Sequence, residues 1–198
     1  MTDSVSVAAA PTSGRGKDKR DRLVAAARKT LHEQGVERTT LALVAAAAEV
    51  PVGNVYYYFK TKDELVLAVL DAYNDDYQVL DTMLARHRTP KARLKGLLKI
   101  WTSAPQRIAM HGCPIGSLCS ELDKRDDDVR RHAATVMGRL ITVAEEQFTQ
   151  LGRRDARELA VTLVASWEGI ALLANTLRDP DLITTEARRL ERWIDSLT

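Results

Sequence analysis

The sequence predicts an all-α protein: an N-terminal three-helix domain with a helix-turn-helix, followed by a larger helical domain, about nine helices in all. Apolar residues recur at spacings of three and four along nearly the whole chain, which is the period of a helix. We find no alternating strand pattern and no repeat of fixed length. Two short helical patterns are separated by only a three- or four-residue turn, which is the spacing of a helix-turn-helix.

Charge and composition divide the chain into three parts, residues 1–18, 19–65 and 66–198. The first is rich in Ser, Ala, Pro and Gly and predicts a disordered basic arm. Residues 1–62 carry ten Lys and Arg against six Asp and Glu, whereas residues 63–198 carry nineteen against twenty-one. This asymmetry favours a nucleic-acid-binding head on a neutral or acidic body.

Other composition signals place the protein in the cytoplasm. The N-terminus has no basic lead before its short apolar run, so it is not a convincing signal peptide. Every apolar stretch of spanning length contains a charge, so we predict no membrane association. Two cysteines do not make a disulfide framework and favour a reducing compartment. We predict no cofactor and no metal, because His111 and Cys113 have no spaced partner pair.

The head begins with a helix over residues 19–34, whose stripe of Leu23, Ala27 and Leu31 ends at Gly35. Thr40 is a natural N-cap for a second helix over residues 41–48. Pro51 suits the first turn of a third helix, which is predicted to run through Tyr57.

The body is predicted from caps and breakers. Thr61 and Glu64 form a capping box that opens one long helix to about Ala85. Thr89-Pro90 opens a helix to Trp101, and a turn-rich segment with two glycines follows. Three more helices are expected over residues 126–151, 155–177 and 180–197.

In a helix-turn-helix the N-terminal residues of the second helix meet base edges in the major groove. Here these residues are Pro51, Val52, Gly53 and Asn54. Asn54 is the polar side chain that can hydrogen-bond a base, Val52 can meet a thymine methyl, and Gly53 lets the backbone come close.

Phosphate contacts are assigned to Tyr57, Thr40 and Lys62. Three adjacent tyrosines cannot all face one core, because successive helical residues point about 100° apart. We therefore expect Tyr57 to be exposed and Tyr56 to be partly packed, and leave Tyr58 open. In the arm, Arg15, Lys17, Lys19 and Arg20 can add non-specific affinity.

Residues 19–70 resemble the DNA-binding domain of the TetR family of bacterial transcriptional regulators. The resemblance rests on "TTLALVAAAAEVPVGNVYYYFKTKDEL" and the preceding helix that ends in Gly35. It implies an all-helical homodimer, a double-stranded DNA operator, and a variable C-terminal domain whose small-molecule effector releases DNA. The family usually has Gly where this chain has Glu49; a left-handed backbone there would cost about 1 kcal/mol.

Dimerisation is predicted from the last two helices. The helix over residues 155–177 is apolar on more than one side, which is typical of burial between two layers. In the final helix Ile183, Ala187, Leu190, Ile194 and Leu197 alternate spacings of four and three, a heptad-like seam. Burial of both helices within one subunit is the alternative.

Candidate effector residues come from different body helices that can converge on a cavity. They are Trp101, Met110, Cys113, Leu118, Trp167, Glu168 and Asn175. Each is also compatible with simple core packing. Cys113 lies at a predicted helix N-terminus, where a thiol pKa can be lowered, so it is a candidate sensor of oxidants or electrophiles as well as an ordinary buried cysteine.

Taken together, the residues predict a ligand-responsive repressor. An enzyme is disfavoured, because the four histidines are scattered and we find no Ser/His/Asp set, phosphate loop or spaced carboxylate pair. A DNA-binding regulator without an effector stays open, and a body core without a cavity would favour it.

Overall fold

The structure, a computed structural model, describes residues 14–125 and 127–197, and every regular element in these ranges is a helix. The predicted all-α class is confirmed. The helices are α1 (Gly14–Arg38), α2 (Leu41–Ala47), α3 (Val52–Tyr58), α4 (Lys62–Leu84), α5 (Pro90–Trp101), α6 (Pro105–His111), α7 (Pro114–Leu122), α8 (Asp128–Gln150), α9 (Ala156–Leu177) and α10 (Pro180–Ser196).

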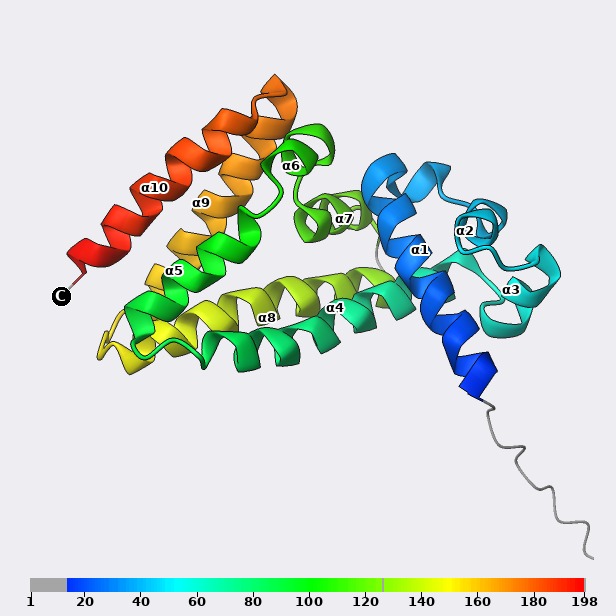
Figure 1. Cartoon of the computed structure of the whole chain (residues 1–198), viewed down its shortest axis with the longest axis horizontal. Coiled ribbons are helices and arrows are strands. Elements are labelled where there is room, and N and C mark those ends of the chain that lie inside the picture. The colour runs from blue at the N-terminus through cyan, green and yellow to red at the C-terminus, as the bar shows by residue number, and fades with distance from the viewer. Residues whose placement is uncertain (1–13, 126, 198) are drawn as a thin grey trace, which may run out of the picture.

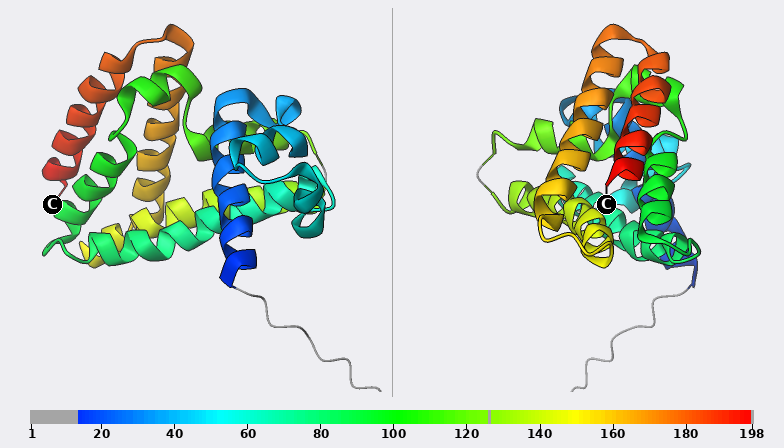
Figure 2. Two further views of the ribbon diagram at one scale, coloured as in Figure 1. Left: turned by 45° about the vertical axis from the view of Figure 1, so that its right-hand side comes forward. Right: turned by 90° about the vertical axis from the view of Figure 1, so that its left-hand side faces the viewer.

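The molecule has a small head and a longer body (Figure 1). Helices α1, α2 and α3 form the head at one end, and α4 leads from the head along α8. Figure 2 shows α4 and α8 side by side along the lower edge of the body. Helix α9 packs on α8, α10 and α6, while α7 lies between α8 and α1 of the head. The body therefore touches the head through both α4 and α7.

The head has its own apolar core, and the predicted stripes supply it. Leu23 and Ala27 of α1, Val44 of α2, Val55 of α3 and Phe59 are at most 2% exposed. Burying a side chain of the size of Val or Leu contributes about 1.5–3 kcal/mol, so these few contacts fix the angle between α2 and α3.

Threonine caps begin three helices as the sequence predicts for them. The hydroxyl of Thr40 accepts from the Leu43 amide at 3.2 Å, and that of Thr61 accepts from the Glu64 amide at 3.1 Å. Thr89 caps α5 in the same way. The capping box at Thr61 is only half formed, because the Glu64 carboxylate accepts from the Lys60 amide, 2.6 Å away, one residue before the cap.

The start of α1 and the segment after Trp101 differ from the prediction. Helix α1 begins at Gly14, so residues 14–18 of the predicted arm are helical, and residues 1–13 lie outside the described residues. Gly35 interrupts α1 with a left-handed φ of 81°, as its role as a helix stop requires. The turn-rich segment after Trp101 contains two short helices, α6 and α7, which brings the described helices to ten.

The heptad-like seam of α10 is largely covered within this chain, and the part of α10 in a dimer interface stays a prediction. Ile183 and Ile194 are fully buried within this chain, Leu190 packs beside both of them, and Leu197 packs on the core that contains Ile194. A heptad spacing places apolar residues on one face but does not say what covers it, and here α9, α5 and α6 cover it.

Helix α9 is buried on one side only. Leu163, Trp167 and Ala174 face the core, whereas Leu172 and Leu173 are 66% and 56% exposed. The predicted burial between two layers is therefore not completed within one subunit. By length and composition α9 is also the one helix in the described ranges that could cross a membrane, but it packs on three helices of its own chain and does not indicate membrane association.

Candidate DNA-binding surface and effector cavity

The turn between α2 and α3 has the left-handed geometry that the sequence put in question. Glu49 has φ 54°, a conformation in which a Cβ is strained. The Val50 amide donates to the Ala45 carbonyl at 3.0 Å and closes the turn. Arg22 of α1 donates to the Glu49 carbonyl at 2.9 Å, so the first helix of the head holds the strained turn in place.

The first turn of α3 is open to solvent. Pro51, Val52 and Gly53 are exposed, Asn54 is half-buried, and Val55 faces the core. Apart from its chain neighbours and the backbone of its own helix, no atom lies within 4 Å of where a Cβ on Gly53 would be, so there is open space at this point. The residues predicted to read bases therefore share one free surface.

The tyrosine run divides between surface and packing. Tyr57 is 77% exposed and Tyr56 is 49% exposed. Tyr58, which the sequence left open, is half-buried and meets the Tyr57 ring edge-on at 5.0 Å. Tyr57 is thus the phenol most available to an outside partner.

Lys62 has partners within the chain. Its ammonium donates to the Val36 carbonyl at 2.9 Å and to the Glu37 carbonyl at 3.3 Å. These carbonyls belong to the end of α1 beyond its kink at Gly35, where a helix terminus needs donors. Lys62 therefore joins α4 to α1, and a phosphate would share an ammonium that already makes two hydrogen bonds.

The body contains a cavity of about 480 Å³ whose walls come from the head as well as from the body. Trp101 of α5 and Trp167 of α9 stack in it with ring centroids 5.5 Å apart. Arg28 and His32 of α1 also line it. An occupant of this cavity would touch α1 directly.

A second cavity, of about 530 Å³, shares Cys113 with the first in its lining. It is lined by Glu168 and Asn175 of α9 and by Gly116 of α7. Burial raises the pKa of the Glu168 carboxyl, whose Oε1 is buried without a hydrogen-bond partner. A Cβ on Gly116 would lie 1.9 Å from Glu168 Oε2, so this glycine makes the room that the carboxylate occupies.

Comparisons with known proteins agree with this architecture. Residues 23–69 match the family model "Bacterial regulatory proteins, tetR family", and residues 90–189 match "Transcriptional regulator LmrA/YxaF-like, C-terminal domain". The chain belongs to the TetR family. It is a transcriptional regulator of the DNA-binding repressor class, in a family of regulators rather than enzymes.

Relatives and a solved structure give the extent of the likeness. The transcriptional regulator AcuR of Cereibacter sphaeroides is 30% identical over 191 residues, covering 86% of this chain and 82% of that protein. The repressor DhaR of a Mycobacterium species is 29% identical over 161 residues, covering 77% of this chain and 80% of that protein. The crystal structure of a TetR regulatory protein from Rhodobacter sphaeroides has a TM-score of 0.75 at 25% identity, and the match covers 88% of this chain and 97% of that one.

The seven candidate effector residues do not meet in one cavity of this TetR-family chain. Trp101 and Trp167 line the first cavity, Glu168 and Asn175 line the second, and Cys113 lines both. The other two candidates lie elsewhere. Leu118 is 5% exposed in the main core, and Met110 is 55% exposed on the surface.

Cys113 is the N-cap of α7, where the sequence placed it, but its pKa moves opposite to what the sensor alternative requires. Burial, together with the nearby Glu168 carboxyl, raises the pKa of the thiol to about 12. The thiol is 7% exposed and accepts from the Gly116 amide at 3.5 Å. A reactive thiolate requires a lowered pKa and access, so the raised pKa and low exposure of Cys113 disfavour the sensor alternative.

Sequence reasoning missed the head's own part in the cavity. Arg28 and His32 of α1 line it, yet neither was a candidate, and the same holds for the body residues Arg107, Tyr73 and Tyr77. His32 was visible as a polar residue one position after Leu31 of the apolar stripe. Its ring nitrogen Nε2 lies 2.9 Å from the Gly112 carbonyl, a contact between α1 and the α6–α7 turn that no local pattern reveals.

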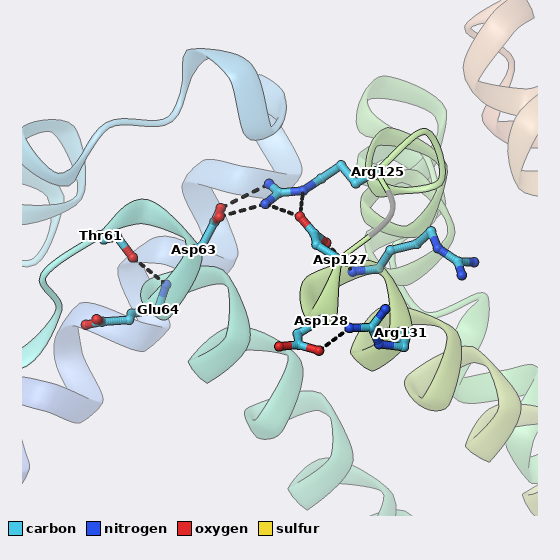
Figure 3. A network of polar contacts seen from close by, with 8 residues as sticks. Thr61, Asp63, Glu64, Arg125, Asp127, Asp128 and Arg131 are labelled. Carbon is cyan, nitrogen blue, oxygen red and sulfur yellow. Dashed lines mark hydrogen bonds and ion pairs between the residues drawn. The ribbon is translucent and has the colours of Figure 1, made fainter.

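A polar network joins the head to the body at the start of α4 (Figure 3). The Arg125 guanidinium donates to both carboxylate oxygens of Asp63, at 3.0 and 2.6 Å, and to Asp127 at 2.6 Å. Asp127 also caps α8 by accepting from the Arg130 amide, and its pKa is lowered chiefly by Arg125. The same arginine thus connects the first turn of α4 to the first turn of α8.

Proposed function

We propose that this regulator binds a palindromic operator as a homodimer in the cytoplasm and leaves it when a small molecule occupies the 480 Å³ cavity. The observation that carries the proposal is that α1 of the head forms part of the cavity lining through Arg28 and His32. A ligand there changes contacts of the DNA-binding domain itself. The presence of this cavity favours induction over the alternative of a regulator without an effector.

The DNA contacts proposed from the sequence fit the exposed surface of the head. Asn54 and Val52 read base edges from the first turn of α3, with Pro51 and Gly53 allowing close approach. Thr40, Tyr56, Tyr57 and Lys62 contact phosphates. Tyr57 is the most exposed of these aromatic side chains, which supports its role.

The dimer proposed here uses the open face of α9 and not the seam of α10. Val161, Ala165, Gly169 and Leu172 follow one another at spacings of four, four and three, and so lie on one side of the helix. Val161 and Leu172 are 43% and 66% exposed, and a Cβ on Gly169 would meet no atom within 4 Å. Apolar and small residues on an exposed face suit close packing with a second copy.

Release is proposed to be a shift between two arrangements of the dimer. Two recognition helices bind only when they are about one helical turn of DNA, or a multiple, apart. The ligand pushes α1 relative to α6, and the His32 contact to the Gly112 carbonyl couples these two helices. The spacing of the heads then no longer fits successive major grooves.

The first test is selection of bound duplexes from a random library at fixed salt. An enriched palindrome with half-sites about one or more turns apart supports the dimeric reader. If no sequence is enriched and binding is lost steeply as salt rises, the head binds only DNA phosphates and does not read sequence.

Base reading and dimerisation are then tested separately. Asn54→Ala should lose about 1–3 kcal/mol of discrimination at one base pair of each half-site, whereas Asn74→Ala on α4 should not. Leu172→Arg should give a monomer by analytical ultracentrifugation, with Thr184→Glu at an exposed position of α10 as the control. A Leu172→Arg dimer, or unchanged base preference in Asn54→Ala, contradicts the corresponding part.

A further inference from the structure

We propose, resting on the effector-controlled function above, that the effector is an amphipathic anion: a carboxylate or similar group bound by Arg107, with an apolar body lying against Trp101. The cavity that holds it is lined by one paired arginine, one arginine without a carboxylate, and a cluster of exposed apolar side chains.

Arg28 is not the anion site, because its charge is already compensated. Its guanidinium donates to the Asp76 carboxylate at 2.5 Å and lies 4.2 Å above the centre of the Tyr73 ring. Asp76 is the only carboxylate lining this cavity, so the Arg28–Asp76 pair leaves no free anionic group there for a cationic ligand. Burial also raises the pKa of Tyr77, so that its phenol stays neutral.

Arg107 of α6 is the second arginine in the lining of this cavity. Within the described residues no carboxylate lies within ion-pair distance of its guanidinium. One of its terminal nitrogens lies 3.5 Å from Nδ1 of His32. The remaining donors of the planar fork are available to a carboxylate, which such a fork binds with two parallel hydrogen bonds.

His32 acts as the positioning residue for Arg107. A carbonyl only accepts, so Nε2, 2.9 Å from the Gly112 oxygen, carries the proton. Nδ1 is then the acceptor that faces Arg107. Burial lowers the pKa of His32 and keeps this neutral form.

The apolar part of the ligand has a surface prepared for it. Three of the chain's exposed large apolar side chains, Val79, Met83 and Ile100, line this same cavity with fractional exposures of 60%, 44% and 38%. Trp101, stacked on Trp167, supplies a flat aromatic face beside them. Apolar groups gathered at a cavity while still exposed indicate a binding surface.

The ligand class is tested with matched triplets: phenylbutanoate, its primary amide and the corresponding amine, and the same three head groups on an octyl chain. Binding to the full-length protein without DNA is followed by tryptophan fluorescence, since Trp101 and Trp167 lie in the cavity, and by thermal shift. The carboxylates should bind at least tenfold more tightly than the amides and amines. Arg107→Gln should abolish that preference, while Arg154→Gln, which removes an exposed charge outside the cavity lining, should keep it.

Preferential binding of amines, equal binding of all three head groups, or carboxylate binding unchanged by Arg107→Gln overturns the anion assignment. Retained operator binding by Arg107→Gln shows that the variant is folded. The two proposals fail differently in the companion assay of DNA release. Release by an amine or amide leaves effector control standing and removes only the anion, whereas failure of every compound to bind removes both.

Discussion

Replacing Glu49 by glycine should stabilise the protein, because the chain places an ordinary residue where the backbone is left-handed. The φ of 54° at Glu49 costs a residue with a Cβ about 1–2 kcal/mol. Glycine removes that strain but adds freedom to the unfolded chain, which offsets about 0.4–1 kcal/mol. The expected net gain is about 0.5–1 kcal/mol, or roughly 1–4 °C in Tm for a chain of this length.

The control for this experiment is Glu49→Ala, which removes the same charge but keeps the Cβ. Thermal and urea unfolding should show Glu49→Gly more stable than both the alanine variant and the unsubstituted protein. The exposed Glu49 carboxylate also lies in the turn that leads to the reading helix. Both variants should therefore bind DNA about twofold more tightly at low salt, which is the effect of removing one negative charge about 8 Å from a phosphate in water. This gain in affinity should fade as salt rises.

The two readouts separate strain from charge. A glycine variant no more stable than the alanine variant would refute the argument from backbone strain. Its most direct explanation would be that Arg22, which donates to the Glu49 carbonyl, fixes the turn so firmly that the backbone gains nothing from relaxing. Tighter DNA binding by glycine alone would instead show that the geometry of the turn, and not the charge, limits recognition.

Three further predictions concern the body. A double-mutant cycle of Arg125→Ala and Asp63→Ala should give a coupling free energy of about 1 kcal/mol in urea unfolding. The pair is bidentate, but its side chains are about a third to a half exposed. A coupling near zero would mean that the pair does not stabilise the contact between α4 and the segment before α8. Cys113, with its pKa raised to about 12, should react with iodoacetamide at pH 7 at least tenfold more slowly than a free cysteine peptide by mass spectrometry; fast alkylation would revive the thiol-sensor hypothesis. Gly116→Ala should destabilise by about 1–2 kcal/mol, and adding Glu168→Ala should restore most of the loss; no rescue would mean that the contact at 1.9 Å is not the cause.

Local chemistry predicted the helices of the head and most of those of the body. Thr40 and Thr61 mark helix starts because their hydroxyls accept amides within the same turn, and Gly35 marks a stop because it takes a left-handed φ. These are interactions over three or four residues, so the sequence contains all the partners. Helix α6 was missed, and α7 was predicted only through its start at Cys113, because each is short and Gly112 between them gives the segment the composition of a loop.

The cavity could be predicted only in part, since its walls are long-range. Trp101 and Trp167 were candidates because large aromatics on separate body helices often converge. Arg28 and His32 were not, because their place in the lining depends on how α1 docks on α6 and α7. The contact between His32 and Gly112 joins residues eighty positions apart, and no spacing rule reaches that far.

The two apolar helices at the C-terminus show why periodicity does not settle which surface is shared. Helix α10 has the more regular seam, yet Ile183 and Ile194 are fully buried inside this subunit, and Ala187, Leu190 and Leu197 are partly buried. Helix α9 has the less regular pattern, yet Leu172 and Leu173 remain exposed after folding. A period reports that one face is apolar, whereas an interface requires apolar surface in excess of what the chain itself can cover. On that criterion we propose that a second copy packs against α9. The Arg107 cavity does not need that copy, since α1, α4, α5, α6 and α7 of one chain line it together with single residues of α8 and α9.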